Sequence, residues 1–465
     1  MENKKRMKTF TFKGGIYPPE HKELAEGKKI TAAFPASKTL TIPITMGGAP
    51  NQPVVAVGDK VTRGQVIAKS DAFVSAPVHS PVSGTVKKIV SNLSTANAEV
   101  PCIVIAADED PNAGETFMPP LDPFACSKEE ALARVKDAGI CGMGGASFPT
   151  HVKLNPPKDC KIDYVLLNAA ECEPYLTVDE QTMDESADKV IDGLLIVQKI
   201  VGGQAKIVLE SNKKHLIPKL EEAAKGKVEV VVVKTKYPQG AEKNIITAVT
   251  GREVKAGGLP ASAGCVVCNV GTVCAISDAF RLGKPLIERA FTVSGLGVKE
   301  PKNLLVPIGT LVSDLIPGAI EVDDSKVVKI LSGGPMMGFS MQSAGFPVQK
   351  GTSGVLFLTE KEIDTAETNP CITCGACVHV CPMRLTPTLI VRSVDAEDLS
   401  AAKKYGLMDC IECGSCAYVC PSRVRLVQTI RMGKNLERGR IAAEKAAAAQ
   451  KAAEAQAQNA NGGAK

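Results

Sequence analysis

Half of the sixteen cysteines repeat one spacing twice. Residues 371–382 read CITCGACVHVCP, and residues 410–421 read CIECGSCAYVCP. Both runs have the form C-x2-C-x2-C-x3-C-P, in which three close thiolates wrap one [4Fe–4S] cluster and the fourth completes the other. The spacing therefore predicts two ligand sets, the first made of Cys371, Cys374, Cys377 and Cys420 and the second of Cys381, Cys410, Cys413 and Cys416.

A glycine follows the second cysteine of each run. Gly375 and Gly414 let the loop backbone pass close to the inorganic core and direct N–H groups at sulfide. The alternative, a pair of zinc knuckles, needs four ligands per site and no following Cys-Pro. We therefore expect iron–sulfur clusters and a protein that moves single electrons. Thiolates free to bind iron also indicate a reducing compartment, the cytoplasm.

Two further segments carry residues suited to ligand binding. Residues 142–150, GMGGASFPT, cluster glycines so that a flat ligand can lie against the backbone. They are not a dinucleotide fingerprint, because a helix precedes them and the third glycine is missing. Glu171 and Glu173 follow a buried-type strand, at the edge where open α/β sheets bind ligands. A plain turn and a solvated loop face are the alternatives for these segments.

The overall composition excludes several classes of protein. The chain has 465 residues, enough for several domains. With 23% charged residues and a net charge of +5, no strong field marks a nucleic-acid or membrane-surface binder. The basic N-terminus lacks the apolar core of a signal peptide. The sequence also has no run of about 18 apolar residues, so we expect no transmembrane helix. We expect no nucleic-acid partner, and membrane association only through other proteins.

The apolar pattern predicts a multidomain α/β chain. Alternation with glycine turns over 46–120 is typical of all-β structure and resembles the barrel-sandwich domain of biotinyl and lipoyl carriers. From 121, a helix capped by Ser127 and alternating strand and helix runs predict an α/β domain. The expected parts are an N-terminal arm at 1–45, the barrel-sandwich domain at 46–120, the ligand-binding α/β domain at 121–284, a small β-grasp domain at 285–340, a linker at 341–365, a helical two-cluster ferredoxin-like domain at 366–431 and an Ala-rich helical or disordered tail at 432–465.

The order of these motifs resembles two related families. GMGGASFPTHVK, NAAECEPY, the Gly-Ala-Glu segment at 240–242 and NVGT at 269–272 resemble the NADH- and FMN-binding site in the flavoprotein subunit of respiratory complex I. The whole chain except the tail, from GGIYPP to the doubled cysteine run, resembles more closely the C subunits of Rnf electron-transport complexes. Those complexes are ion-translocating ferredoxin:NAD+ oxidoreductases. The resemblance implies a complex-I-flavoprotein-like α/β domain and an SLBB-like β-grasp domain.

The resemblance also implies a noncovalent FMN, with NAD(H) as substrate. Glu171 and Glu173 would face the nicotinamide nucleotide and are the candidate catalytic residues. Because two acids repel a 2′-phosphate, we expect NADH rather than NADPH. The cofactor-binding residues implied are Gly142, Gly144, Gly145, Phe148, Lys153, Asn168, Glu171, Glu173, Gly240, Asn269 and Thr272.

Three positions depart from the family pattern. Ser147 stands where these families usually have glycine, and Ala170 stands where the complex I flavoprotein has an acid. Tyr17 replaces the histidine of a GGI-His-PP motif.

The chemistry of the implied cofactors predicts the function. NADH gives two electrons as hydride, an iron–sulfur cluster accepts one, and a flavin can do both. We expect a peripheral NAD(H)-binding subunit on the cytoplasmic side of the cell membrane, which passes electrons between two [4Fe–4S] clusters, FMN and NAD(H). Its partners would be the integral-membrane and iron–sulfur subunits of the same complex and, indirectly, ferredoxin. The alternatives are an iron–sulfur relay or docking subunit without functional flavin, and the NADH-oxidising subunit of a soluble hydrogenase or reductase.

Other segments have weaker signals. CVVCNVGTVC (265–274) has a metal-like spacing, but its valines predict a buried strand with core cysteines; a third metal site is the alternative. The glycine turn SGGPMMG (332–338) is expected to pack against the flavin-type domain. The tail is expected to be a solvated helix, with docking on a partner as the alternative.

Overall fold

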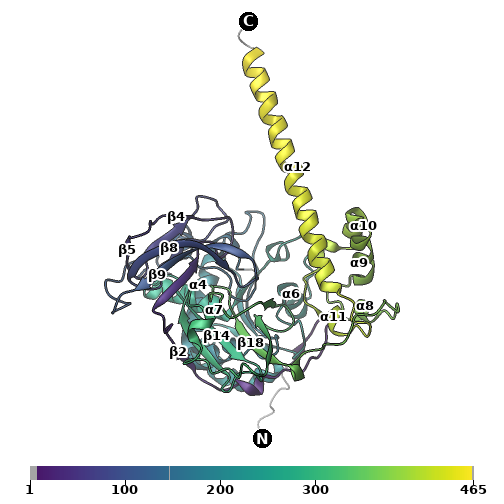
Figure 1. Ribbon diagram of the computed structural model, residues 1–465, viewed down its shortest axis with the longest axis horizontal. Coiled ribbons are helices and arrows are strands. Elements are labelled where there is room, and N and C mark those ends of the chain that lie inside the picture. Colours follow the sequence, from purple (N-terminus) through teal and green to yellow (C-terminus); the bar gives the residue numbers. More distant parts are fainter. Residues whose placement is uncertain (1–7, 146, 463–465) are drawn as a thin grey trace. The chain divides into compact units, whose positions relative to one another are not determined.

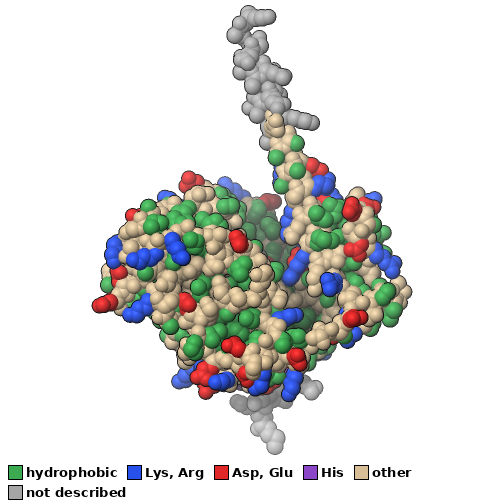
Figure 2. Space-filling view, viewed as in Figure 1, with side chains coloured by type: hydrophobic (Ala, Val, Ile, Leu, Met, Phe, Trp, Pro, Cys, Tyr) green, Lys and Arg blue, Asp and Glu red, His purple; other side chains and the backbone are tan. Residues whose placement is uncertain are grey.

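The computed structural model describes residues 8–145 and 147–462. The chain divides into two compact units. The first unit runs to Phe12 and resumes from Tyr17 to Asp364, and the second combines Lys13–Ile16 with the chain from Thr365 onward. Figure 1 labels the elements of each unit. On the face shown in Figure 2, basic and acidic side chains are interspersed, as the small net charge predicts.

A five-stranded parallel sheet forms part of the first unit, with strand order β1-β12-β11-β10-β13. The central residues of β10, β11, β12 and β13 are mostly apolar and buried, because both faces of the sheet are covered. This agrees with the predicted α/β domain. The strands are β1 (Thr9–Phe10), β10 (Tyr164–Ala169), β11 (Gln204–Glu210), β12 (Glu229–Val233) and β13 (Cys265–Asn269).

Alternate side chains of these strands enter two cores. Val165 and Leu167 of β10 lie in a core with helices α1, α4, α5 and α7, whereas Leu166 lies with α6 on the other face. Cys265 and Cys268 of β13 are buried in these cores, as predicted. The helices of this unit are α1 (Lys128–Asp137), α2 (Thr150–Lys153), α3 (Val178–Glu185), α4 (Ala187–Val201), α5 (Ile217–Ala224), α6 (Glu242–Thr250) and α7 (Val270–Arg281).

Helix α1 begins where its sequence predicts. Ser127 Oγ accepts the N–H of Glu130 at 3.2 Å, and the Glu130 carboxylate accepts the N–H of Ser127 at 2.8 Å. This reciprocal capping box satisfies donors that the first helical turn leaves open.

Two small antiparallel sheets form the barrel-sandwich region. One has the order β3-β9-β8-β5 and the other β4-β6-β7. In carrier domains the corresponding hairpin tip carries the modified lysine. In this chain the tip contains Phe73 and contacts α2, where His151 Nε2 lies 3.1 Å from the Phe73 carbonyl oxygen. The strands are β3 (Thr39–Pro43), β4 (Gln52–Pro53), β5 (Lys60–Val61), β6 (Val66–Lys69), β7 (Val78–His79), β8 (Gly84–Leu93) and β9 (Glu99–Ala107).

A six-stranded mixed sheet, β17-β16-β18-β14-β15-β2, corrects two predictions. The linker predicted at 341–365 contains β18, whose six residues are all buried between β16 and β14. The arm predicted at 1–45 supplies β1, β2 and β3 to three different sheets, because an extended chain satisfies its backbone groups by pairing. The strands are β2 (Ile30–Ala32), β14 (Glu288–Ser294), β15 (Lys302–Pro307), β16 (Val327–Ser332), β17 (Phe339–Met341) and β18 (Gly354–Thr359).

Short 3-10 helices join these elements. Of those in the described residues, five belong to the first unit and the last belongs to the second unit. They are η1 (Lys22–Leu24), η2 (Ser211–Leu216), η3 (Pro260–Ala263), η4 (Val312–Leu315), η5 (Glu360–Glu362) and η6 (Leu407–Asp409).

The second unit is helical and contains both cysteine runs. Gly375 and Gly414 have φ values of 78° and 80° and begin α8 and α11, so the two runs share one local conformation. Helix α12 begins before the predicted tail and extends beyond the other helices of this unit (Figure 1). The helices are α8 (Ala376–Val380), α9 (Pro387–Asp395), α10 (Leu399–Lys404), α11 (Ser415–Tyr418) and α12 (Leu426–Gly462).

Residues 13–16 belong to this second unit although they lie far away in sequence. The N–H of Gly15 donates to the carbonyl of Val380 at 2.7 Å. A Cβ on Gly14 would lie 2.8 Å from the carbonyl oxygen of Cys381. The two glycines therefore allow close backbone approach beside a predicted ligand.

The contact of α4 with α7 gives a stability prediction. A Cβ on Gly193 would lie 1.9 Å from the carbonyl oxygen of Val273. Gly193→Ala should therefore lower the free energy of unfolding by about 1–3 kcal/mol through overpacking. Urea denaturation of the full chain, followed by circular dichroism, measures this loss.

Gly439→Ala on α12 is the matched control. Apart from its chain neighbours and the backbone of its own helix, no described atom lies within 4 Å of a Cβ at this position. The change should stabilise the helix by up to about 1 kcal/mol, because alanine is the better helix former. Equal effects of the two substitutions would contradict close packing of α4 on α7.

Candidate functional site

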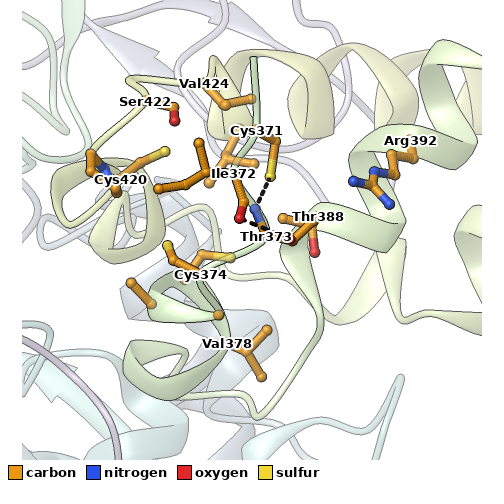
Figure 3. Close-up of a pocket in the computed structure, with 15 residues that line it drawn as sticks. Cys371, Ile372, Thr373, Cys374, Val378, Thr388, Arg392, Cys420, Ser422 and Val424 are labelled. Atoms are coloured by element: carbon orange, nitrogen blue, oxygen red, sulfur yellow. Dashed lines mark hydrogen bonds between the residues drawn. The ribbon is translucent and has the colours of Figure 1, made fainter. Parts of the chain in front are cut away.

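The first predicted ligand set borders one cavity of about 240 Å³ in the second unit. Figure 3 shows Cys371 and Cys374 on one loop and Cys420 on a separate segment around the same space. Four zinc-bound sulfurs would each lie about 2.3 Å from one ion, so this space suits a multi-atom cluster better. The cysteines that line it are Cys371, Cys374, Cys377 and Cys420.

The second predicted set lines a smaller cavity of about 20 Å³. In both cavities, three cysteines of one run meet the fourth cysteine of the other run. The structure thus brings the predicted residues together, and their role as ligands stays a prediction. The cysteines of this cavity are Cys381, Cys410, Cys413 and Cys416.

Backbone N–H groups donate to sulfur in both runs. The N–H of Thr373 lies 3.4 Å from Cys371 Sγ, and the N–H of Glu412 lies 3.4 Å from Cys410 Sγ. Thr373 and Glu412 have φ values of 56° and 57°, so each run bends the same way after its first cysteine. Hydrogen bonds to ligand sulfurs are among the features that set a cluster's reduction potential.

The two cavities differ in their surroundings. Cys371 is exposed, whereas Cys413 is buried. Beside the second cavity, Glu412 accepts hydrogen bonds from Lys434 at 2.8 Å and Arg431 at 3.1 Å. Burial opposes ionisation, but these two cations lower the pKa of Glu412. Since burial and nearby charge tune potentials, clusters in the two cavities would differ in potential.

The flavin-type residues lie at the carboxyl edge of the parallel sheet. The register pairs Asn168 of β10 directly with Asn269 of β13. Asn168 Nδ2 donates to the Gly240 carbonyl at 2.9 Å. Asn269 Oδ1 accepts the N–H of Gly271 at 2.9 Å and so caps α7. These contacts bring three of the implied flavin-binding residues together.

The glycine-rich loop lies against the start of α7. The N–H of Met143 donates to Thr272 Oγ1 at 3.0 Å, and a Cβ on Gly144 would lie 3.1 Å from the Asn269 side chain. Apart from its chain neighbours, no described atom lies within 4 Å of a Cβ on Gly145, so the loop has an open side that a flat ligand can cover. Gly142, also in this loop, donates its N–H to the Phe148 carbonyl at 2.9 Å.

Two neighbouring residues have properties that matter for ligand binding. Ser147 has a φ of 51°, which lies in the left-handed region of backbone conformation. Glycine adopts this region most easily, and glycine is the residue that the related families usually have at this position. Phe148 is 42% exposed, which leaves its ring accessible for stacking on a ligand ring.

Lys153 places a positive charge at this edge. Its Nζ donates to the Val267 carbonyl at 3.0 Å and forms an ion pair with Glu242. Burial lowers the pKa of Lys153, but Glu242 and Cys268 together outweigh burial and raise it above its ordinary value. The side chain is therefore charged at neutral pH and suits an anionic part of a ligand.

Both predicted catalytic acids have backbone partners. Glu171 accepts the N–H groups of Asp179 at 2.7 Å and Glu180 at 3.2 Å, at the start of α3. Glu173 accepts the N–H groups of Met336 at 3.1 Å and Met337 at 2.9 Å. That Glu171 and Glu173 face the nicotinamide nucleotide stays a prediction.

The glycine turn SGGPMMG packs on Glu173, as predicted, since a Cβ on Gly334 would lie 2.2 Å from Glu173 Oε2. Burial raises the pKa of Glu173 to about 7, although the two backbone N–H groups oppose this.

Sequence reasoning missed two charged residues here, the half-buried Asp179 and the buried Arg289. Asp179 accepts a hydrogen bond from Asn269 Nδ2 at 2.6 Å, and burial and Glu171 raise the pKa of Asp179. Arg289 of β14 donates to the carbonyls of Thr352 at 2.5 Å and Met143 at 3.3 Å. Asp179 lies only a few residues after Glu171 and Glu173, and this closeness in sequence could have identified it as part of the site. Arg289 lies too far along the chain to be found by spacing.

These residues together fit a flat ligand with polar edges. Asn168, Asn269 and Thr272 supply hydrogen-bonding groups, Lys153 supplies charge, and Gly145 leaves an open side. FMN has such a shape, and its phosphate would match the cation. When bound, FMN exchanges hydride as well as single electrons.

Four sequence families match successive parts of the chain. Residues 10–110 match the RnfC barrel sandwich hybrid domain, and residues 135–278 match the Nuo51 FMN-binding domain. Residues 290–340 match the SLBB domain, and residues 363–421 match the 4Fe-4S dicluster domain.

Whole proteins match over most of their length. The chain is 46% identical to the C subunit of the proton-translocating ferredoxin:NAD+ oxidoreductase complex of Clostridium ljungdahlii, over 94% of this chain and 96% of that protein. It is 42% identical to the C subunit of the Na+-translocating complex of Acetobacterium woodii, over 91% of this chain and 96% of that protein. Among solved structures, NAD+-reducing [NiFe]-hydrogenase in the H2-reduced state matches with a TM-score of 0.48 and 20% identity, over 66% of this chain and 62% of that chain.

The cysteine geometry gives a metal-content prediction. After anaerobic reconstitution the chain should bind about eight iron atoms, and Cys371→Ala should bind about four, because one cubane loses a ligand. Iron and sulfide analysis with electron paramagnetic resonance measures this. Cys160→Ala, outside both cavities, should keep the full iron content. Zinc in place of iron, or an unchanged content in Cys371→Ala, would contradict the assignment.

Proposed function

The chain belongs to the family of C subunits of Rnf-type ion-translocating ferredoxin:NAD+ oxidoreductases, and from this premise we propose that it passes electrons between two [4Fe–4S] clusters, FMN and NAD(H). The observation that carries the proposal is the presence of both chemical sites in one chain. Two four-cysteine cavities lie in the second unit, and a flavin-type sheet edge lies in the first. A pair of electrons taken as hydride then leaves as two single electrons.

The chain's own residues would bind and orient the reactants. The side chains of Asn168, Asn269 and Thr272 already make hydrogen bonds to the backbone of Gly240, Gly271 and Met143, respectively, so they are held in place before FMN binds. Preformed donors lose little conformational entropy on binding. Glu171 and Glu173 would contact the nicotinamide nucleotide and disfavour the 2′-phosphate of NADPH. We assign Phe148 to ring stacking.

We also propose the partners and the location. Among the described residues, no helix is long and apolar enough to span a bilayer. The relatives are named as subunits of multi-subunit complexes. The chain would therefore reach the membrane by docking on integral-membrane and iron–sulfur subunits at the cytoplasmic side, with ferredoxin as an indirect partner.

One experiment separates this function from a relay subunit without flavin. The full chain is reconstituted anaerobically with iron, sulfide and FMN, and NADH oxidation is followed with ferricyanide as acceptor. Bound flavin and NADH oxidation are expected. Clusters without flavin or NADH oxidation would instead favour the relay subunit, which the serine at 147 and the alanine at 170 would then explain.

The two acids give a separate prediction. Glu171→Gln with Glu173→Gln should change the NADH dissociation constant by about tenfold, because each lost charge alters an interaction worth about 1 kcal/mol or more. The cluster spectra should not change, because the acids and the cysteines lie in different units. Titration of flavin fluorescence with NADH measures the affinity. Glu221→Gln with Glu222→Gln, on the exposed face of α5, is the control. Unchanged NADH binding in the first double variant would argue against this nucleotide site.

A further inference from the structure

The acidic loop at 170–177 has an unusual backbone. Glu171 and Tyr175 have φ values of 44° and 69°, in the left-handed region that favours glycine. Non-glycine residues persist in this region only where their surroundings hold them, and such residues cluster at functional sites. The loop that carries both predicted catalytic acids is therefore held by something outside itself.

One anchor is Lys22, a residue of the N-terminal arm. Its Nζ donates to the carbonyl of Glu173 at 3.1 Å and to the carbonyl of Leu176. Lys22 is only 5% exposed, so these bonds form away from water, where an ionic hydrogen bond is strong. The ammonium group thus joins two points of the loop, and the strained Tyr175 lies between them.

The neighbours of Lys22 strengthen the same contact. The N–H of Tyr175 donates to the Glu20 carbonyl at 2.8 Å. The His21 ring stacks on the Tyr175 ring with centroids 4.8 Å apart. Thr177 Oγ1 donates to the Ala25 carbonyl at 3.5 Å. Residues 20–25 therefore hold the loop along its second half.

A second buried lysine holds the start of the loop. Lys213 of η2 is fully buried, donates to the Ala170 carbonyl at 3.1 Å and lies 3.6 Å from Glu210. Burial and the neighbouring Lys213 lower the pKa of Lys22, whereas Glu171 and Glu210 oppose that change. Two buried cations beneath one loop are costly unless acids compensate them. The loop carries such acids, so the cations and the acids stabilise each other.

We propose that Lys22 is a positioning residue of the nucleotide site. By holding the carbonyls of Glu173 and Leu176, it fixes the loop conformation and so the directions of the Glu171 and Glu173 carboxylates. This gives the GGIYPPEHK segment a role in NAD(H) recognition, and it rests on the function proposed above. The alternative is a general support role, in which Lys22 stabilises the whole domain without particular effect on the nucleotide.

The experiment compares Lys22→Met with Lys29→Met in the full chain reconstituted with FMN and clusters. Lys29 is exposed on the same arm and serves as the control. Lys22→Met should raise the NADH dissociation constant and KM by about tenfold or more, since a small misplacement of binding groups is costly. The kcat, the FMN content and the cluster signals should stay near those of the unmodified chain. Lys29→Met should change none of them.

His21→Ala keeps the proposal testable if Lys22→Met does not fold. This milder change removes the ring that stacks on Tyr175, and it should raise the NADH dissociation constant a few-fold with FMN retained. If Lys22→Met folds and binds NADH as tightly as the unmodified chain, the proposal is overturned. If Lys22→Met does not fold, the same result in His21→Ala overturns it. Parallel losses of FMN and NADH in the variant that folds would also overturn it, in favour of general support. Failure of the unmodified chain to bind NADH would instead overturn the proposed function.

Discussion

Parallel strands that run in register end at one edge, and this constraint decides which polar side chains meet. The pairing of β10 with β13 sets Asn168 against Asn269, and the pairing of β10 with β11 brings Glu210 to the same edge. Each strand then continues into a segment used for binding or support. The acidic loop follows β10, η2 with Lys213 follows β11, and α7 follows β13. The site is thus a direct product of sheet topology.

Burial of charge is the second feature of this edge. Lys22, Lys213 and Arg289 are buried, and burial raises the pKa values of Glu173 and Glu210 to about 7. Carboxyl groups with such values are partly protonated at neutral pH, which reduces the cost of burying them. Removing one cation would leave neighbouring acids uncompensated and is therefore more damaging than removing a surface charge. This explains how a loop with two left-handed residues persists.

Sequence reasoning succeeds where the signal is local. The capping of a helix by Ser127 and the apolar strands of the parallel sheet follow from neighbouring residues, and the grouping of cysteines follows from a repeated spacing. It fails where distant segments meet. The apolar run of β18 is a local sign of a buried strand that the linker prediction overlooks, but its pairing with β14 and β16, which are not adjacent to it in sequence, has no local signal. The role of Lys22 cannot be predicted from its neighbours, because its acceptors Glu173 and Leu176 lie 151 and 154 residues further along.

The iron–sulfur unit is not one continuous stretch of polypeptide. Residues 13–16 are part of it, and the N–H of Gly15 donates a hydrogen bond to the carbonyl of Val380, next to Cys381. A fragment cloned from Thr365 onward would therefore lack a native piece of its own structure. Those who express this unit separately would do better to fuse the missing tetrapeptide by a flexible linker, or to add it as a synthetic peptide, before judging whether the excised unit can assemble its metal centres.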